Sequence, residues 1–154
     1  MDIRLAPEPF DPQAEEAAFA AGRRDIGAVV SFTGVCRERT DGEGVGELFL
    51  DHYPGFTEKE IARLAADVAA RCQCPDIKVI HRVGRLTPGE PIVLVVALSE
   101  HRDAAFEAVR LLMDYLKTDA PLWKRETGPN GERWIEPRAD DIARRAAAEI
   151  TDRT

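Results

Sequence analysis

The longest apolar run of the chain, PIVLVVALS at residues 91–99, places the strongest constraint on the fold. A run this rich in aliphatic and β-branched residues is typical of a strand, and it is apolar enough to lie in the centre of a sheet. The turn TPGE, which contains Pro88 and Gly89, joins it to a second strand pattern, DIKVIHRVGRL. The sequence therefore predicts a sheet with these two strands as neighbours.

Further strands are predicted at IRLAP, IGAVVSFTGVC and GELFLDHY. The sequence WKRETGPNGERWIE contains Asn130-Gly131 between two Trp-containing arms, which is a strong hairpin signal. By contrast, RERTDGEGVG combines glycines with charges and predicts a mobile loop.

Helices are predicted between these strands. DPQAEEAAFAAG has Asp11 as N-cap, Pro12 at the first position and Gly22 at the end, and TEKEIARLAADVAARC begins with Thr57 and Glu60 in capping-box spacing. A long helix from about His101 to Thr118 has one apolar stripe, could be capped by Ser99 or Glu100, and stops before Pro121; the stripe consists of Ala105, Val109, Leu112 and Leu116.

Inserted helices between neighbouring strands indicate an α+β fold with a largely antiparallel sheet. The 154 residues correspond to a single domain, 1–154, with a strand and a helix in residues 1–24 and a polar helix or tail in residues 139–154.

Composition and cysteine content narrow the function classes. A net charge of −7 works against nucleic-acid binding, and no apolar run is long enough to span a membrane, so we expect a cytoplasmic protein that binds small anions locally. The three cysteines Cys36, Cys72 and Cys74 do not suggest a disulfide framework or a metal site. A Cys36 persulfide is retained as an alternative sulfur carrier.

Two lysines, Lys117 and Lys124, flank Pro121 in the stretch YLKTDAPLWKRE. Each has an ordinary explanation, because a cation is favoured at a helix C-terminus and lysines often protect edge strands. Pro121 places them on different elements joined by a stiff turn, which is the arrangement that a site requires.

Cations at the other end of the long helix are less easily explained. His101 and Arg102 lie where the helix dipole disfavours positive charge, and either nearby Glu100 and Asp103 or a bound anion such as phosphate compensates. Arg37, which opens the glycine-rich loop, is a third candidate ligand. His81 and Arg82 repeat the His-Arg pair inside a strand and are interpreted as structural.

Several blocks, in order, resemble the large catalytic subunit of molybdopterin synthase: SFTGVCR, DHYPGFTEK, VIHRVGRLTPGE, SEHRDAAFEA, MDYLKTDAPLWKRE and RWIE. The resemblance covers nearly the whole chain. It implies an α/β-hammerhead fold with an added β subdomain, and a homodimer of large subunits flanked by two small ubiquitin-like subunits, forming a heterotetramer.

The resemblance also implies the reaction, with no cofactor or metal. The small subunit carries a thiocarboxylate on its C-terminal Gly-Gly tail, and two sulfurs pass to cyclic pyranopterin monophosphate to form the molybdopterin dithiolene. Lys117 and Lys124 match the essential lysines; the anion pocket and its lining are matched by Arg37, His101, Arg102, Phe32, Met113 and Arg138. The loop from Glu38 to Gly46 departs from the family pattern.

Clustered cations lower a lysine pKa, so we expect Lys117 to act as base or nucleophile and Lys124 to hold the substrate or the tail. His101 and Lys117 are 16 residues apart on one helix, about 24 Å at 1.5 Å per residue, so the His101 end must serve the site of a second chain if both ends share one site. A non-catalytic adaptor that docks a ubiquitin-like tail is the other alternative, and it would need neither lysine.

Overall fold

The computed structural model describes residues 1–40 and 42–151. Its helices are α1 Pro12–Ala20, α2 Thr57–Cys72, α3 Arg102–Thr118 and α4 Ala139–Thr151. Its strands are β1 Asp2–Ala6, β2 Ala28–Val35, β3 Arg39–Thr40, β4 Glu43–Gly44, β5 Glu47–His52, β6 Asp76–Arg82, β7 Gly84–Leu86, β8 Pro91–Ser99, β9 Leu122–Gly128 and β10 Gly131–Ile135.

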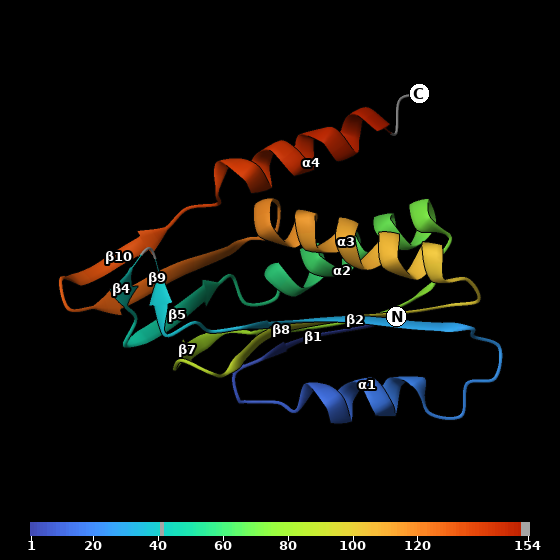
Figure 1. Ribbon diagram of the computed structural model, residues 1–154, viewed down its shortest axis with the longest axis horizontal. Helices are drawn as coiled ribbons and strands as arrows, with labels where there is room; N and C mark the ends of the chain where they lie inside the picture. The colour runs from blue at the N-terminus through green and yellow to red at the C-terminus, as the bar shows by residue number, and fades with distance from the viewer. Residues whose placement is uncertain (41, 152–154) are drawn as a thin grey trace.

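The first sheet has the order β1-β6-β8-β2, and its β6–β8 and β8–β2 pairs are antiparallel whereas β1 and β6 are parallel. The apolar strand β8 lies inside this sheet, as predicted, with Val95 and Ala97 fully buried. Figure 1 shows α2 and α3 against one face of the sheet and α1 against the other. Burial of β8 on both faces explains why its sequence shows no polar alternation.

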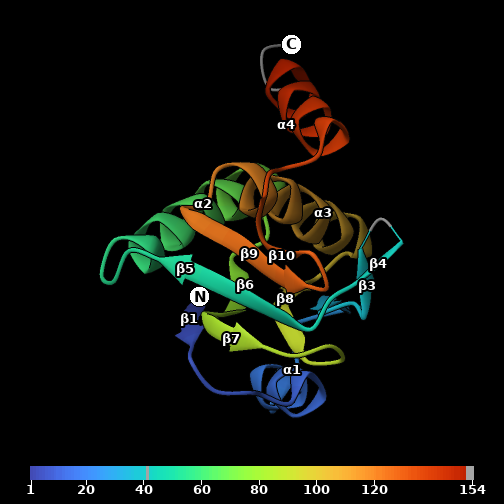
Figure 2. The same ribbon diagram turned by 90° about the vertical axis from the view of Figure 1, so that its left-hand side faces the viewer.

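A second, wholly antiparallel sheet has the order β10-β9-β5-β7; it lies at one end of the first sheet in Figure 1 and in front of it in Figure 2. It contains the predicted hairpin, in which Gly128 pairs with Gly131. The predicted α+β fold with a largely antiparallel sheet and an added β subdomain is thereby confirmed.

The segment DIKVIHRVGRL is two strands, not the single strand that its pattern predicted. β6 ends at Arg82 in the first sheet, and β7 begins at Gly84 in the second. The chain turns between them because Gly84 adopts φ +80°, a conformation that glycine tolerates, while the Val83 N–H donates to the Ala6 carbonyl. This break is how one continuous apolar pattern supplies both sheets.

The main core lies between α2, α3 and the first sheet. The predicted stripe of α3 is buried throughout, and it packs with α2 residues such as Ile61 and Leu64. A smaller apolar cluster, which includes Ile80 and Leu94, fills the space between α1 and the opposite face of the sheet. Both faces of the central strands are therefore closed to water.

The structure confirms Asp11 as an N-cap, since its carboxylate accepts the backbone N–H groups of Gln13 and Ala14. The predicted capping box at Thr57 is wrong, because the N-cap is Phe56 and it makes no side-chain cap bond. The Thr57 hydroxyl instead accepts the Tyr53 N–H at 2.9 Å and donates to the Pro121 carbonyl at 3.0 Å. That hydroxyl links α2 to the turn between α3 and β9.

The predicted capping of α3 by Ser99 or Glu100 is also wrong. His101 is the N-cap residue and makes no side-chain cap bond, while the Ser99 hydroxyl accepts the His101 N–H at 3.3 Å. The Ser99 hydroxyl therefore accepts the N–H of the residue before the helix and not an N–H group of the first helical turn.

The segment predicted as a loop after β2 contains the short β3–β4 ribbon. Thr40 in this ribbon is buried, and its hydroxyl donates to Glu126 of β9 at 3.0 Å. The pattern missed the ribbon because two-residue strands have no readable period. Asp41 of this segment and residues 152–154 of the expected C-terminal helix or tail lie outside the described residues. Within the described residues, no helix is long and apolar enough to cross a membrane.

We expect Thr57→Val to lower the free energy of unfolding by about 1–3 kcal/mol, because it leaves the Tyr53 N–H and the Pro121 carbonyl without their shared partner. Urea denaturation followed by circular dichroism measures the change. Thr127→Val makes the same chemical change at an exposed position of β9 and should alter stability by less than about 0.5 kcal/mol. Equal effects of the two variants would show that the Thr57 hydroxyl does not anchor the turn.

Candidate active site

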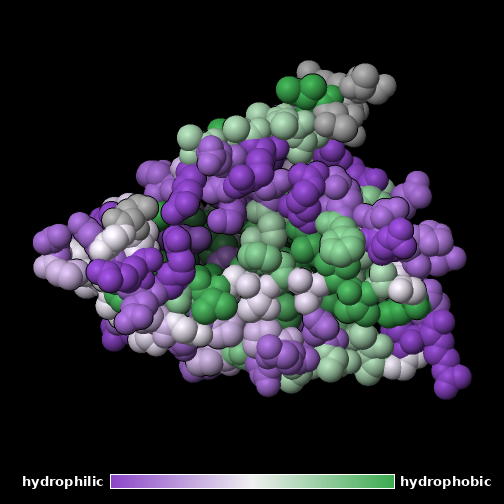
Figure 3. Space-filling model, viewed as in Figure 1, coloured by the Kyte–Doolittle hydropathy of each residue, from purple (hydrophilic) through white to green (hydrophobic). Residues whose placement is uncertain are grey.

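A cavity of about 690 Å³ lies where the end of β2, the last turns of α3, β9 and the first turn of α4 meet. In Figure 3 the surface is hollowed between the hydrophilic end formed by the second sheet and the body of the protein. The cavity is lined on its β2 and α3 side by Phe32, Cys36, Arg37, Met113 and Lys117, and on its other side by Lys124, Glu126, Arg138, Asp141 and Arg144.

Lys117 and Lys124 enter this cavity from two elements. Lys117 lies in the last turn of α3, which ends at Thr118, and Lys124 lies on β9, which begins directly after Pro121. The turn is held by the Thr57 hydroxyl and by an edge-to-face contact of Trp123 with Tyr53, whose ring centroids are 5.0 Å apart. The prediction that Pro121 separates two stiffly joined elements agrees with this geometry.

Protection of an exposed sheet edge does not explain why a lysine occupies position 124. β9 lies between β10 and β5, so Lys124 is on an interior strand of the second sheet, where it pairs with Leu50 and Ile135. A lysine that is partly buried on an interior strand is costly unless its surroundings use it.

Burial lowers the pKa of Lys124, and the positive charge of Lys117 lowers that pKa further. Arg37 acts in the same direction, whereas Asp141 and Glu126 oppose the change. The sequence predicted a lowered pKa for Lys117. In the structure the lowered pKa belongs to Lys124, because Lys124 is on an interior strand and is desolvated there. An amine whose pKa is lowered can take or give a proton nearer to neutral pH.

Lys117 faces a carboxylate from the C-terminal helix. Its Nζ lies 3.9 Å from Oδ2 of Asp141, and Asp141 is buried and also accepts a hydrogen bond from Arg144. Arg144 extends the network to Asp114 of α3, with 3.5 Å between Nε and Oδ1. Sequence reasoning missed Asp141 and Arg144, because nothing local in a polar terminal helix indicates which of its charges face a site.

Of the other predicted site residues, the structure brings Phe32, Arg37, Met113 and Arg138 to the wall of this cavity. They come from β2, the segment after it, α3 and the segment before α4. These four lie far apart in the sequence, so their convergence is a property of the fold.

His101 and Arg102 are not part of this cavity in the same chain. They lie at the N-terminal end of α3, with side chains 80% and 82% exposed. His101 lies 3.9 Å from Glu100, and Arg102 lies 3.7 Å from Asp103. The acidic neighbours considered from the sequence are therefore the partners of these two cations within one chain.

His81, interpreted from the sequence as structural, lines the cavity as well. Its pKa is lowered to about 4, mainly by burial. The hydrogen bond of its ring to the Arg82 carbonyl raises the pKa, and the charge of Lys124 lowers it further. Nδ1 lies 2.8 Å from that carbonyl oxygen, so the neutral ring donates from Nδ1. Arg82 is buried and donates to the carbonyls of Pro7 and Arg85, which agrees with a structural role.

The Cys36 thiol lies in the cavity wall, but its surroundings suppress the thiolate. Burial raises the pKa of Cys36, and the charges of Glu126 and Glu90 raise it further. A nucleophilic thiol requires the opposite environment. Among the described residues, no cluster of three or more His, Cys, Asp or Glu side chains is arranged to hold a metal ion.

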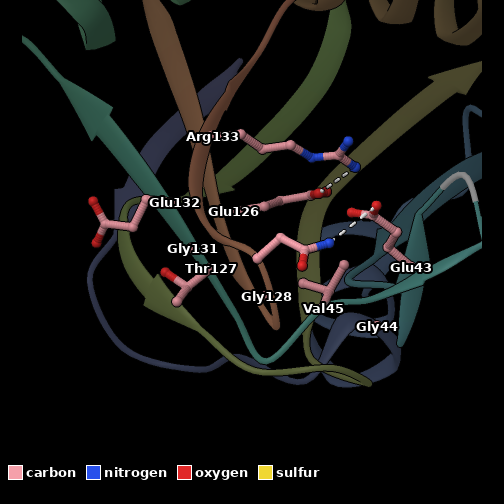
Figure 4. A pocket seen from close by; sticks show the side chains of 10 residues that line it. Glu43, Gly44, Val45, Glu126, Thr127, Gly128, Gly131, Glu132 and Arg133 are labelled. Atoms are coloured by element: carbon pink, nitrogen blue, oxygen red, sulfur yellow. Dashed lines mark hydrogen bonds and ion pairs between the residues drawn. The ribbon is translucent and has the colours of Figure 1, made fainter.

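A smaller cavity of about 60 Å³ lies next to the site, between the β3–β4 ribbon and the β9–β10 hairpin (Figure 4). Glu126 and Arg133 face one another there at 3.2 Å, and the Asn130 amide donates to Glu43 at 3.5 Å. Glu126 lines both cavities and also accepts the Thr40 hydroxyl. It therefore connects the ribbon to the strand that carries Lys124.

The fold and the large cavity together define an α+β protein with a charged cavity on which two lysines converge from different elements. The model of the MoaE protein family matches residues 5–119. The chain is 49% identical over 143 residues to the molybdopterin synthase catalytic subunit of Pseudomonas aeruginosa, covering 93% of this chain and 95% of that protein. The chain belongs to the MoaE family.

Solved structures agree with this assignment. The chain resembles a molybdopterin biosynthesis MoaE protein from Burkholderia ambifaria with a TM-score of 0.79 and 43% identity, covering 96% of this chain and 97% of that one. It resembles molybdopterin synthase from Staphylococcus aureus with a TM-score of 0.77 and 27% identity, covering 86% and 96%. The family and the enzyme class expected from the sequence are confirmed.

The lowered pKa of His81 predicts a specific loss of stability in acid. The unfolded chain takes up a proton near pH 6.5 and the folded chain near pH 4, so the stability that the neutral ring provides is present above pH 6.5 and lost as the pH falls toward 4. Between pH 7.5 and 4.5 this amounts to about 2–3 kcal/mol.

His81→Asn, whose amide can still donate to the Arg82 carbonyl, should therefore show a smaller loss of stability between those two pH values than the unaltered protein, measured by urea denaturation. The same substitution at the exposed His101 serves as the control and should leave the difference unchanged. An unchanged pH dependence in His81→Asn would show that His81 is not the titrating group.

Proposed function

We propose that the protein is the catalytic subunit of molybdopterin synthase and transfers two sulfurs from a thiocarboxylated partner to cyclic pyranopterin monophosphate. The partner is a small ubiquitin-like subunit whose C-terminal Gly-Gly tail enters the large cavity. The assembly is a homodimer of large subunits with two small subunits, and it works in the cytoplasm. The observation that carries the proposal is the convergence of Lys117 and Lys124 on one cavity lined by further cations.

Charge distribution supports a small phosphate-containing substrate. The chain has a net charge of −7, yet the wall of this cavity carries five lysines and arginines beside four carboxylates, so basic groups outnumber acidic ones there. A cavity of about 690 Å³ is within the range of small-molecule sites. Arg37 and Arg138 are placed to bind the phosphate, because a guanidinium group matches its geometry with paired donors.

The pKa directions support a division of work between the lysines. Opening the cyclic phosphate and adding sulfur at two neighbouring carbons requires proton transfer and stabilisation of developing negative charge. Lys124, whose pKa is lowered, is suited to proton transfer, and Lys117, beside Asp141, is suited to holding the substrate or the tail as a cation. This allocation reverses the one expected from the sequence.

His101 and Arg102 belong, in this proposal, to the site of the second large subunit. The 17 residues of α3 separate them from Lys117 by about 24 Å in the same chain. Among the described strands, β2 pairs only with β8 and carries exposed Val29, Phe32 and Val35, so it offers an apolar edge to a second copy.

Strand β2 also connects the two ends of the proposed composite site. It starts beside the N-terminus of α3, where Ala28 pairs with Ser99, and ends at the cavity. A two-fold axis that pairs two β2 strands antiparallel would bring the start of one strand beside the end of the other. His101 and Arg102 of one copy would then lie near the cavity of its mate.

Lys117→Ala and Lys124→Ala should each reduce sulfur transfer by at least about a hundredfold, since each removes a group that acts on the reacting atoms. The assay follows conversion of cyclic pyranopterin monophosphate by purified enzyme and thiocarboxylated small subunit. Cys36→Ser should retain activity. Loss of turnover in Cys36→Ser together with retention in Lys117→Ala would establish the persulfide alternative, and activity in both lysine variants would favour an adaptor.

Mixing Lys117→Ala chains with Arg102→Ala chains should restore activity that neither variant has alone. Random exchange makes about half of the dimers mixed, and each mixed dimer has one intact site, so recovery should approach about a quarter of normal activity. The measurement is turnover after subunit exchange, with exchange verified by native mass spectrometry. Mixed dimers that form without gaining activity would show that both groups act within one chain.

A further inference from the structure

We propose that Asp141, in the first turn of α4, is a positioning residue for the lysine pair: its carboxylate fixes the Lys117 ammonium group and balances the positive charge around Lys124. The inference rests on the proposed function of the large cavity and adds a residue to it. It also gives the C-terminal helix a role in the site.

The contacts of Asp141 are those of a fixed carboxylate. It is 5% exposed, it accepts from Arg144, and its Oδ2 lies 3.9 Å from the Lys117 Nζ. Its backbone N–H donates to the Arg138 carbonyl at 3.0 Å, which sets the start of α4. The first turn of a helix is a favourable place for an anionic side chain, and Asp141 occupies it at the wall of the cavity.

Other contacts hold α4 on α3 and α2 without Asp141. Arg145 pairs with Asp119 at 2.7 Å and its guanidinium lies 4.0 Å from the centre of the Tyr115 ring. Ala148 is buried in the main core, and its carbonyl accepts from Arg71 at 3.0 Å. Loss of the Asp141 carboxylate should therefore change the charge in the cavity while the helix stays docked.

Basic and acidic side chains of the cavity act in opposite directions on the pKa of Lys124, and Asp141 is one of the acidic ones. Lys117 and Arg37 make protonation of Lys124 harder, whereas Asp141 and Glu126 make it easier. The charged and titratable groups that line the cavity with the lysines from the segment after β2 and from β6 are Cys36, Arg37 and His81. Those from β9, the segment after β10 and α4 are Glu126, Glu136, Arg138, Asp140 and Arg144.

Asp141 alone among these carboxylates is within 4 Å of a cavity lysine in the described part of the chain. Replacing it with Asn keeps the shape but removes the charge. Lys124 should then lose its proton at a lower pH, and the Lys117 side chain should become mobile.

The experiment that tests this is a pH titration of lysine side-chain resonances by NMR, on the full chain labelled at lysine, in the unaltered protein and three variants. Asp141→Asn should move the Lys124 titration to lower pH. Arg144→Gln removes a neighbouring cation and a contact between α3 and α4 but keeps the Asp141 carboxylate, so it should not lower the Lys124 titration. Glu149→Gln, which alters an exposed partner of Arg145 on the same helix, should change neither lysine.

A lowered Lys124 titration in both Asp141→Asn and Arg144→Gln would overturn the proposal, because undocking of α4 would then explain the shift. An unchanged titration in Asp141→Asn would overturn it as well.

Sulfur transfer gives a second readout. Asp141→Asn should lower kcat by about tenfold with a smaller change in KM, because the lysines lose their alignment rather than their ability to bind anions. The limb of the pH–rate profile that reports Lys124 should move to lower pH, in the same direction as the NMR titration. Glu149→Gln should keep both kcat and the profile. A fall in kcat without movement of that limb would indicate a structural role and count against the proposal.

The two readouts separate this inference from the proposed function. If Lys117→Ala retains full sulfur transfer, the proposed function fails, whereas the titration of Asp141→Asn still reports whether the carboxylate controls the lysine pair. If Lys117→Ala abolishes transfer and Asp141→Asn leaves both kcat and the titration unchanged, the proposed function stands and Asp141 is not a positioning residue.

Discussion

The turn at Pro121 is the constraint on which the site depends. A proline cannot continue α3, so the chain leaves the helix after Thr118 and enters β9 at Leu122. The buried Thr57 hydroxyl holds the Pro121 carbonyl from the side of α2. Two lysines seven positions apart thus approach one cavity from a helix end and an interior strand, a geometry that a continuous helix would not provide.

Much of this arrangement can be predicted from the sequence because its causes are local. A proline beyond the first turn cannot continue a helix, the apolar run of β8 requires burial, and Asp11 caps the helix that follows it. The predictions that were wrong concern residues for which the sequence allows two local conformations or hydrogen-bond partners and does not indicate which one forms. Thr57 and Glu60 fit a capping box, but the Thr57 hydroxyl bonds Tyr53 and Pro121, and Gly84 divides one apolar run between two sheets.

The electrostatics of the site could not be predicted, because they arise from tertiary contacts. The sequence places cations near both lysines but does not indicate which lysine is buried, and burial is the largest cause of the lowered pKa of Lys124. Strand order decides this, since β9 becomes an interior strand only after the β5–β9 pairing forms. Asp141 reaches Lys117 only because α4 packs on α3, and the contacts that dock it are made by Arg145 and Ala148 on later turns.

Several cations are harder to keep charged together in a poorly solvated cavity than on an exposed surface patch. Each cation added to a poorly solvated cavity makes the next one harder to keep charged, so a lysine on an interior strand tends toward the neutral form. Carboxylates at the cavity wall limit that tendency, and two of them, Glu126 and Asp141, come from different elements, one from β9 and one from α4. The result is a lysine with a lowered pKa, Lys124, beside a second lysine, Lys117, that faces a carboxylate. In the mechanism that we propose, Lys124 moves protons while Lys117 binds an anion, and this arrangement requires both the hairpin and the C-terminal helix to be in place.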